Sequence, residues 1–206
     1  IGFIWDPLED DWNRGYELLK KYKNEKGNCR VTIKYKCDDL NLGLWISVQR
    51  RNIQSISKEK KEKLDEIGFI WDPLEDDWNR GYELLKKYKE ENGDCRVHIN
   101  YKYGDFNLGK WVSHRRETIK TISRERKEKL DEIGFIWDPL EDDWNRGFES
   151  LQKYKEEKGD CRVPSRYKYE DFNLGKWVNH QRGNIQSLSK ERREKLDKIG
   201  FIWDAR

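Results

Sequence analysis

Apolar residues recur at helical spacing near the start of the chain. Trp12, Tyr16 and Leu19 are separated by four and then three residues, which places them along one face of a helix. The Asp6-Pro7 pair before this stripe is typical of a helix start, and the glycine after it is typical of a stop. The pattern predicts a first helix that begins at Pro7 or three residues later and ends at Lys26.

A second helix is predicted after a connecting segment that looks extended around Val31 and Tyr35. Asn41 is a favourable N-cap, because its side chain can accept a hydrogen bond from the first turn. One side of this helix carries Leu42, Trp45, Ile46, Gln49 and Ile53. The opposite side carries Leu44, Ser47, Val48 and Arg51. The first of these sides is expected to be buried and the second to face outward.

A third helix is expected from Ser57, another favourable N-cap, to about Ile67, where Gly68 ends it. A short apolar linker, residues 69–71, then leads to Asp72, which starts the Asp-Pro signal of a new helix. Three helices and a linker therefore form one unit of the chain.

The whole pattern returns with a fixed period. The string IGFIWDPLEDDWNRG begins at Ile1, Ile67 and Ile133, and IGFIWD returns at Ile199, so the period is 66 residues. Such self-similarity is typical of a tandem array. We therefore predict an all-α fold of three tandem three-helix bundle repeats. The chain divides into the end of a preceding repeat (1–7), repeat 1 (8–71), repeat 2 (72–137), repeat 3 (138–203) and a tail (204–206).

The composition predicts small cores of aromatic residues beneath a charged surface. Charged residues make up 40% of the 206 residues and apolar ones 34%, a balance that alone favours disorder. Ten Trp and ten Tyr residues counter it, because aromatic side chains bury the most surface per residue. The sequence shows no apolar run that could cross a membrane and no signal peptide, so an intracellular location is expected, in the cytoplasm, nucleoid or nucleus.

The sequence gives little support for an enzyme active site, a cofactor site or a metal site. Three of the four cysteines hold one equivalent position each, so no repeat contains its own disulfide pair and reduced thiols are expected. Cys95 and His98 have a metal-like spacing, but the other repeats lack the histidine. The sequence shows no phosphate-binding loop and no dinucleotide-binding turn. We therefore predict a protein that is not an enzyme and that has no cofactor and no metal.

The third helix of each repeat has an unusual order of charges. Lys58, Lys60 and Lys61 lie at its start, whereas the helix dipole favours cations at the end. Two interpretations remain open. A helix start with N–H groups and cations is a natural phosphate site. Alternatively, these lysines belong to a solvated face with salt bridges between neighbouring turns.

Differences between the repeats gather before the second helix and on its outward face. The counterparts of Leu44 and Val48 are Lys110 and His114 in repeat 2, and Lys176 and His180 in repeat 3. Such a variable face on a fixed scaffold is expected of a recognition surface, and also of relaxed constraint. The arginines beside this face are the same in all repeats, namely Arg50, Arg116 and Arg182. Their persistence favours a contact surface.

The candidate nucleic-acid surface combines the connecting segment, the second helix and the start of the third. In repeat 1 its members are Arg30, Lys34, Lys36, Gln49, Arg50, Arg51 and Lys58. In repeat 2 they are Arg96, Lys102, Lys110, His114, Arg115, Arg116 and Arg124. In repeat 3 they are Arg162, Arg166, Lys168, Lys176, His180, Gln181, Arg182 and Lys190. The alternative for each glutamine is a hydrogen bond that ties the helix to a loop, and for each fixed arginine an ion pair.

These features resemble the helicase-associated domain. The matching residues of the first repeat are Trp12, Tyr16, Leu19, Tyr22, Gly27, Cys29, Val31, Leu42, Gly43, Trp45, Gln49, Arg50, Leu64, Gly68, Phe69 and Trp71. The third repeat is closest to the family pattern, with Val163-Pro164 and Gln181-Arg182, whereas the second has His98 and Arg115 at two of those positions. The resemblance implies a small all-helical module that occurs in tandem, often follows superfamily 2 helicase domains, and binds nucleic acid.

Together these observations predict a non-catalytic module that binds nucleic acid, DNA more than RNA, in the C-terminal accessory region of a helicase-like protein. The second helix and the loop before it would approach the polymer, and the start of the third helix would contact the backbone. A helicase motor domain in the same chain is a further expected partner, whereas a membrane and a small-molecule substrate are not. The alternative is a protein-interaction scaffold that uses the same face.

Overall fold

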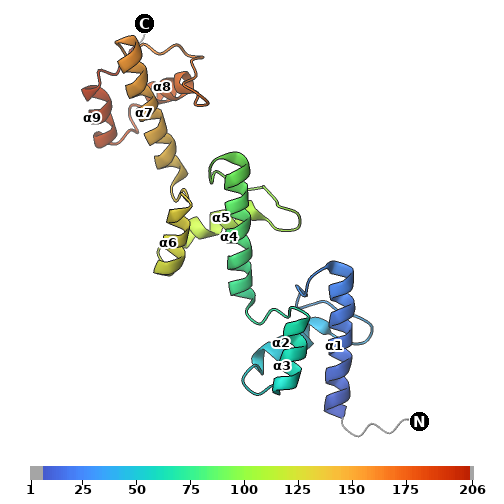
Figure 1. Ribbon diagram of the computed structural model, residues 1–206. Coiled ribbons are helices and arrows are strands. Elements are labelled where there is room, and N and C mark those ends of the chain that lie inside the picture. The colour runs from blue at the N-terminus through green and yellow to red at the C-terminus, as the bar shows by residue number, and fades with distance from the viewer. Residues whose placement is uncertain (1–6, 205–206) are drawn as a thin grey trace. The chain divides into compact units, whose positions relative to one another are not determined.

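The computed structural model describes residues 7–204, which divide into two compact units between Glu83 and Leu84. The first unit contains α1 (Pro7–Lys26), α2 (Leu42–Arg51), α3 (Lys58–Glu66) and the beginning of α4 (Pro73–Asn92). The second contains the rest of α4 with α5 (Leu108–Glu117), α6 (Arg124–Glu132), α7 (Pro139–Lys158), α8 (Leu174–Gly183) and α9 (Lys190–Lys198). In this part of the chain there is no strand, and the long, short, short order of helices recurs (Figure 1). The all-α prediction is confirmed.

Side-chain caps fix most of the helix starts where the sequence predicts them. The Asn41 side chain accepts a hydrogen bond from the Leu44 amide, and Ser57 accepts one from the Lys60 amide. Asp138 accepts from two amides in the first turn of α7. The corresponding cap of α1, Asp6, lies outside the described residues. Because each cap satisfies an amide that the helix itself cannot, it fixes where the helix begins.

Two local predictions for the first repeat are wrong. The segment around Val31 and Tyr35 forms no strand; turns at residues 33–34 and 38–39 interrupt it, with one isolated bridge between Cys37 and Leu40. Ile53 was expected on the buried side of α2, but this helix ends at Arg51 and Ile53 is exposed. Helical periodicity stops with the helix, so it says nothing about the side chains in the following turn.

Each core is built around aromatic residues, as the repeats at the two ends of the described region show. In repeat 1, Trp12 stacks on Tyr16 with 5.3 Å between ring centroids and packs against Trp45 at 6.2 Å. In repeat 3, Trp144 stacks on Phe148 at 5.1 Å in the same way. Both clusters also bury a leucine from each of the three helices and the phenylalanine of the following linker.

Glycine allows the first two helices of a repeat to approach closely. A Cβ atom on Gly15 would overlap the indole of Trp45, and one on Gly147 would overlap the indole of Trp177. The indole therefore fills the space that a side chain would need, and it crosses directly over the helix backbone. This contact holds the second helix in one orientation on the first, and with it the residues that the second helix presents outward.

A further glycine sets the connecting loop against the start of the second helix. A Cβ atom on Gly43 would overlap the carbonyl groups of Thr32 and Ile33, and the Gly43 amide donates to the Tyr35 carbonyl oxygen at 3.2 Å. Gly175 has the same relation to the loop of repeat 3, with its amide 2.9 Å from the Tyr167 carbonyl oxygen. The loop and the helix start therefore form a single surface.

Candidate nucleic-acid interface

The fixed arginine of the second helix is held by the backbone of the linker. Arg50 Nε donates a hydrogen bond to the Ile70 carbonyl oxygen at 2.7 Å, and its guanidinium carbon lies 5.6 Å from the centre of the Phe69 ring. Arg116 bonds Ile136 in the same way at 2.8 Å. These half-buried side chains join the second helix to the linker that follows the third, so they stabilise the repeat itself.

Burial lowers the pKa of these arginines. Loss of solvent lowers the pKa of the Arg50 guanidinium below its usual value, while the nearby Asp76 carboxylate acts in the opposite direction. Burial likewise lowers the pKa of Arg116. An arginine remains protonated under all ordinary conditions. A charged donor to the linker carbonyl is therefore always available.

The arginine after the first helix joins one repeat to the next helix. Arg30 forms a bidentate pair with Asp76 in the first turn of α4, with Nε–Oδ2 and Nη2–Oδ1 distances of 3.0 and 2.9 Å. Arg96 contacts both Asp142 and Asp143 near the start of α7. Sequence reasoning did not identify these acids as partners. The signal was present, because the arginine and the acids each recur at one position in every repeat.

The glutamine that repeats 1 and 3 share in the second helix is buried rather than presented to solvent. Gln49 is 8% exposed, and its Oε1 accepts a hydrogen bond from Trp12 Nε1 at 3.1 Å. Gln181 is 4% exposed. The structure therefore does not bring these two residues into the outward-facing set. Gln49 ties the second helix to the first helix, not to a loop as the alternative interpretation had it.

Cations at the start of the third helix are paired with carboxylates. In α3, Lys61 lies 2.9 Å from Asp65, and Lys60 reaches across to Glu9 on α1 at 2.5 Å. Lys58 is more loosely paired, at 3.7 Å from Glu62, and its side chain is 90% exposed. Arg124 and Lys190 have the same exposed position and i,i+4 partners, Glu128 and Glu194. This geometry is that of the salt-bridged face, from which only the first cation of each helix projects.

The connecting loop and the second helix present cations that have no salt bridge in the described part of the chain. In repeat 1 they are Lys34 and Lys36 of the loop and Arg51 at the end of α2. In repeat 2 they are Lys102 and Lys110, and in repeat 3 Arg166, Lys168 and Lys176. All of these side chains are exposed. The loop cations and those at the helix start lie on the surface that Gly43 and its counterparts hold together. We call these residues the loop–helix cations. Arg51 is not one of them, because it lies at the other end of α2.

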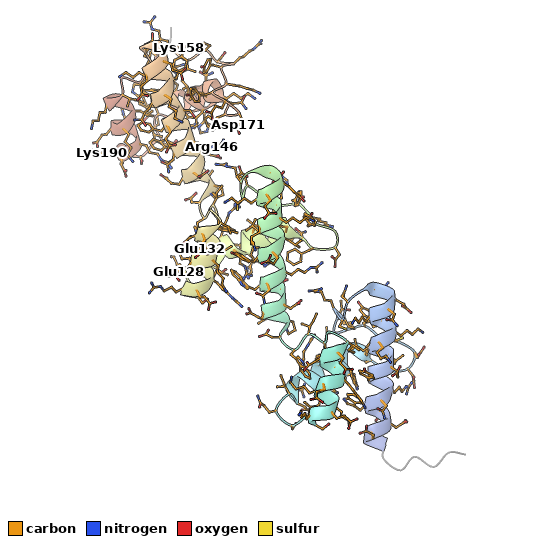
Figure 2. All side chains as sticks on the ribbon, in the orientation of Figure 1. Glu128, Glu132, Arg146, Lys158, Asp171 and Lys190 are labelled. Atoms are coloured by element: carbon orange, nitrogen blue, oxygen red, sulfur yellow. The ribbon has the colours of Figure 1, made fainter. Side chains whose placement is uncertain are left out.

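Acids interrupt this surface, but arginines of the first helix engage two of them. Arg146 of α7 lies 3.3 Å from Asp171 in the loop before α8 (Figure 2). Arg14 of α1 forms the corresponding ion pair with Asp39. These pairs neutralise one loop acid in each of the two repeats, while Asp38 and Glu170 remain in the same loops. They are solvent-exposed pairs, so they affect local charge more than stability.

The remaining predicted site residues are more scattered. His114 and His180 are exposed on α5 and α8, and His114 lies 3.9 Å from Glu117. Arg182 repeats the linker bond of Arg50, at 2.8 Å from the Ile202 carbonyl oxygen, and Arg115 is half-buried against Trp111. Arg162, the counterpart of Arg30, is exposed. These positions add to the loop–helix cations only where the side chain faces outward.

The described residues contain no cluster of histidine, cysteine and acidic side chains able to hold a metal ion. Cys29, Cys95 and Cys161 are buried as free thiols, and burial is the main cause that raises the pKa of each. A thiol with a raised pKa is a poor nucleophile and a poor metal ligand. Within residues 7–204, no helix is both apolar and long enough to span a bilayer.

Comparison with known families gives three matches in tandem. The Helicase associated domain family matches residues 9–72, 75–138 and 141–204. The searches of curated proteins and of solved structures found no match. The three matched segments cover most of the chain, so it belongs to the helicase-associated domain family. A domain of this family is an accessory, non-catalytic module, and its context is a helicase.

Proposed function

We propose that this chain is a nucleic-acid-binding accessory module that contacts the phosphate backbone through its loop–helix cations. The observation that carries the proposal is the contrast between two groups of cations. The fixed arginines and most cations of the third helices are held by carbonyl oxygens and carboxylates, whereas the loop–helix cations are exposed without a salt bridge in the described residues. Charge that the fold does not use is available to a polyanion.

The three repeats would act together. Each repeat supplies only a few phosphate contacts, which are weak alone, but repeats in one chain bind with a high effective concentration after the first contact. With roughly six to ten phosphate contacts in total, affinity is expected to fall about 10³- to 10⁵-fold between 50 and 200 mM salt. We take DNA as the first candidate and RNA as the alternative polymer.

One observation in repeat 1 favours the second candidate function, which is a protein-interaction scaffold. Ile33 and Leu44 are 57% and 52% exposed, and they lie on the loop and helix start that Gly43 brings together. The counterparts of Leu44 are lysines. An exposed apolar pair at this place suits a protein surface better than a phosphate, so repeat 1 is the site at which a protein partner or the helicase motor would dock.

Fluorescence anisotropy with labelled single-stranded DNA, duplex DNA and RNA of equal length tests the proposal. We expect binding at 50 mM salt that weakens steeply with added salt, because counterions are released when phosphates are neutralised. The scaffold alternative predicts no binding to any of these probes. Substitution of Leu44 by Lys, the residue found in repeats 2 and 3, should strengthen binding if repeat 1 uses the same face.

A further inference from the structure

Repeat 3 contains an open cavity of about 310 Å³ between the start of α7, the end of α8 and the turn that leads into α9. Its apolar lining includes Trp144, Trp177 and Leu188, and its polar lining includes Gln181 and Arg192. Small-molecule sites in proteins typically measure about 300–1,000 Å³. The cavity is therefore large enough for a single heteroaromatic ring with part of its substituent.

One hydrogen-bond donor on this cavity lacks the partner that its counterpart has. In repeat 1, Trp12 Nε1 donates to Gln49 Oε1 at 3.1 Å. In repeat 3, Trp144 is 4% exposed, and its Nε1 has no hydrogen-bond partner although Gln181 occupies the same position as Gln49. A buried donor without a partner costs roughly 1–3 kcal/mol. The site is therefore poised for a guest that rearranges its hydrogen bonds.

The difference between the two repeats has a visible cause. The Gln181 amide nitrogen lies 3.4 Å from His180 Nδ1, so the amide is turned toward the rim of the cavity. Repeat 1 has Val48 in place of this histidine, and a valine offers no hydrogen bond. In repeat 3, the Gln181 amide therefore lies toward His180 and not toward the Trp144 indole, and repeat 1 has no histidine at this position.

We propose that this cavity binds a nucleobase splayed out of a single strand, an inference that rests on the proposed function and assigns a site to it. An acceptor on the base edge would replace His180 as the partner of the Gln181 amide nitrogen. The Gln181 amide oxygen could then accept from Trp144 Nε1, as Gln49 accepts from Trp12. Nucleobases carry such acceptors on their edges beside flat apolar faces.

The surroundings of the cavity suit the rest of a nucleotide. Both faces of the Trp144 ring have neighbours, with Phe148 stacked at 5.1 Å and the Arg192 guanidinium 4.9 Å from the ring centre, so the base meets the edge of the indole. Arg192 is ion-paired with Glu141. Charge for the phosphate therefore comes from Lys190, which is 92% exposed at the start of α9 (Figure 2) and only loosely paired with Glu194 at 3.7 Å, and from the first amides of that helix.

A single strand is the form that can supply such a base. In a duplex the base edges are paired and the faces are stacked, and extraction of one base costs a few kcal/mol. In a single strand the bases turn outward at little cost and fill apolar pockets. The cavity thus gives repeat 3 a preference for single strands that backbone contacts alone do not provide.

The test compares a single-stranded oligonucleotide with an abasic strand of the same length, by anisotropy at constant salt. Ser187 lines the cavity, and a Ser187→Trp substitution would fill it. Ser55 occupies the equivalent turn in repeat 1, and both serines donate to the carbonyl oxygen three residues earlier, so Ser55→Trp is the matched control. A second variant, His180→Val, restores the residue of repeat 1 without adding bulk.

We expect the natural sequence and Ser55→Trp to bind the base-bearing strand about tenfold more tightly than the abasic strand, in line with the one or two hydrogen bonds that an accommodated base adds. Ser187→Trp should lose that difference and keep its affinity for the abasic strand. His180→Val should keep the difference, because its Gln181 can accept from Trp144 Nε1 and still donate to the base. Retention of the difference in a folded Ser187→Trp, as judged by circular dichroism, or its loss in His180→Val would overturn the cavity proposal alone. Absence of binding to both strands in every protein would instead overturn the proposed function and the cavity with it.

Discussion

Arg50 Nε donates a hydrogen bond to the carbonyl oxygen of Ile70, which lies twenty residues further along the chain, at 2.7 Å. This bond joins the end of α2 to the linker after α3, and Arg116 and Arg182 repeat it. A residue that the sequence analysis assigns to the phosphate-binding surface thus also has a structural role. The candidate surface moves from these arginines to the loop and the start of the second helix.

Substitution of Arg50 by Ala should lower stability. The variant loses a charged hydrogen bond and the contact with the Phe69 ring, and we expect a loss of about 1–3 kcal/mol in the free energy of unfolding. Urea unfolding followed by tryptophan fluorescence measures it. Arg51→Ala is the control in the same helix, because Arg51 is exposed, and it should change stability by less than about 0.5 kcal/mol. Equal stability of the two variants would show that the linker bond contributes nothing.

Substitution of Gly147 by Ala should destabilise repeat 3. The added methyl group would overlap the Trp177 indole, so a loss of about 2 kcal/mol is expected. Gly183→Ala is the control in the same repeat. A methyl group on Gly183 meets nothing within 4 Å, so this change at a helical position should raise stability by about 0.5–1 kcal/mol. Thermal unfolding by circular dichroism compares the two, and a stable Gly147→Ala would mean that the helices are not in contact there.

The four cysteines should differ in reactivity. Cys29, Cys95 and Cys161 are buried and their pKa values are raised by loss of solvent, whereas Cys37 is only half-buried in the loop of repeat 1. Because the thiolate is the reactive form, one thiol should react quickly with a disulfide reagent at pH 8 and three should react only on unfolding. A Cys37→Ser variant should lack the fast phase. Four equally fast thiols would be incompatible with the described cores.

Stability should decrease at acid pH through the aspartates near the ends of α3 and α6. Lys61, and secondarily the indole of Trp71, lower the pKa of Asp65, and Lys127 and Trp137 do the same for Asp131. A lowered pKa in the folded state gives stability that is present above the usual aspartate pKa and lost as the pH falls through the folded value. These pairs are largely exposed, so the effect is modest.

The corresponding measurement is the melting temperature between pH 7 and pH 3. Asp65→Asn with Asp131→Asn should flatten the decrease, because the ion pairs are already absent at pH 7. Glu66→Gln with Glu132→Gln makes the same change of charge on the neighbouring residues of α3 and α6 and should leave the curve unchanged. A curve that both double variants alter equally would show that net charge, not the aspartate pairs, sets the acid sensitivity.

Local chemistry made much of the fold predictable from the sequence. Ser57 and Gly68 bracket α3 because capping and left-handed φ angles are properties of single residues. The partners of the arginines were not predictable in the same way. The contacts of Arg50 with Ile70 and of Arg30 with Asp76 depend on where three helices and a loop meet, which periodicity does not encode. The family resemblance, by contrast, rests on recurring residues and is confirmed.

The cavity of repeat 3 likewise could not be predicted from the sequence. Gln49 and Gln181 occupy one position of the repeat, yet only Gln49 accepts a hydrogen bond from a tryptophan of the first helix. His180 stands where repeat 1 has Val48, and its ring nitrogen lies 3.4 Å from the Gln181 amide nitrogen. The sequence shows the substitution but not its effect on the indole.

The most direct measurement is the salt dependence of DNA binding by Lys36→Gln with Lys102→Gln and Lys168→Gln, one loop–helix cation from each repeat. The control is Lys61→Gln with Lys127→Gln and Arg193→Gln, which removes the same charge from cations paired with aspartates in the third helices. The loop variant should bind more weakly, with a slope of log affinity against log salt reduced by about 0.9 for each lost contact, while the control keeps the natural slope. Equal slopes for the two triple variants would contradict a phosphate surface built from the loops and second helices.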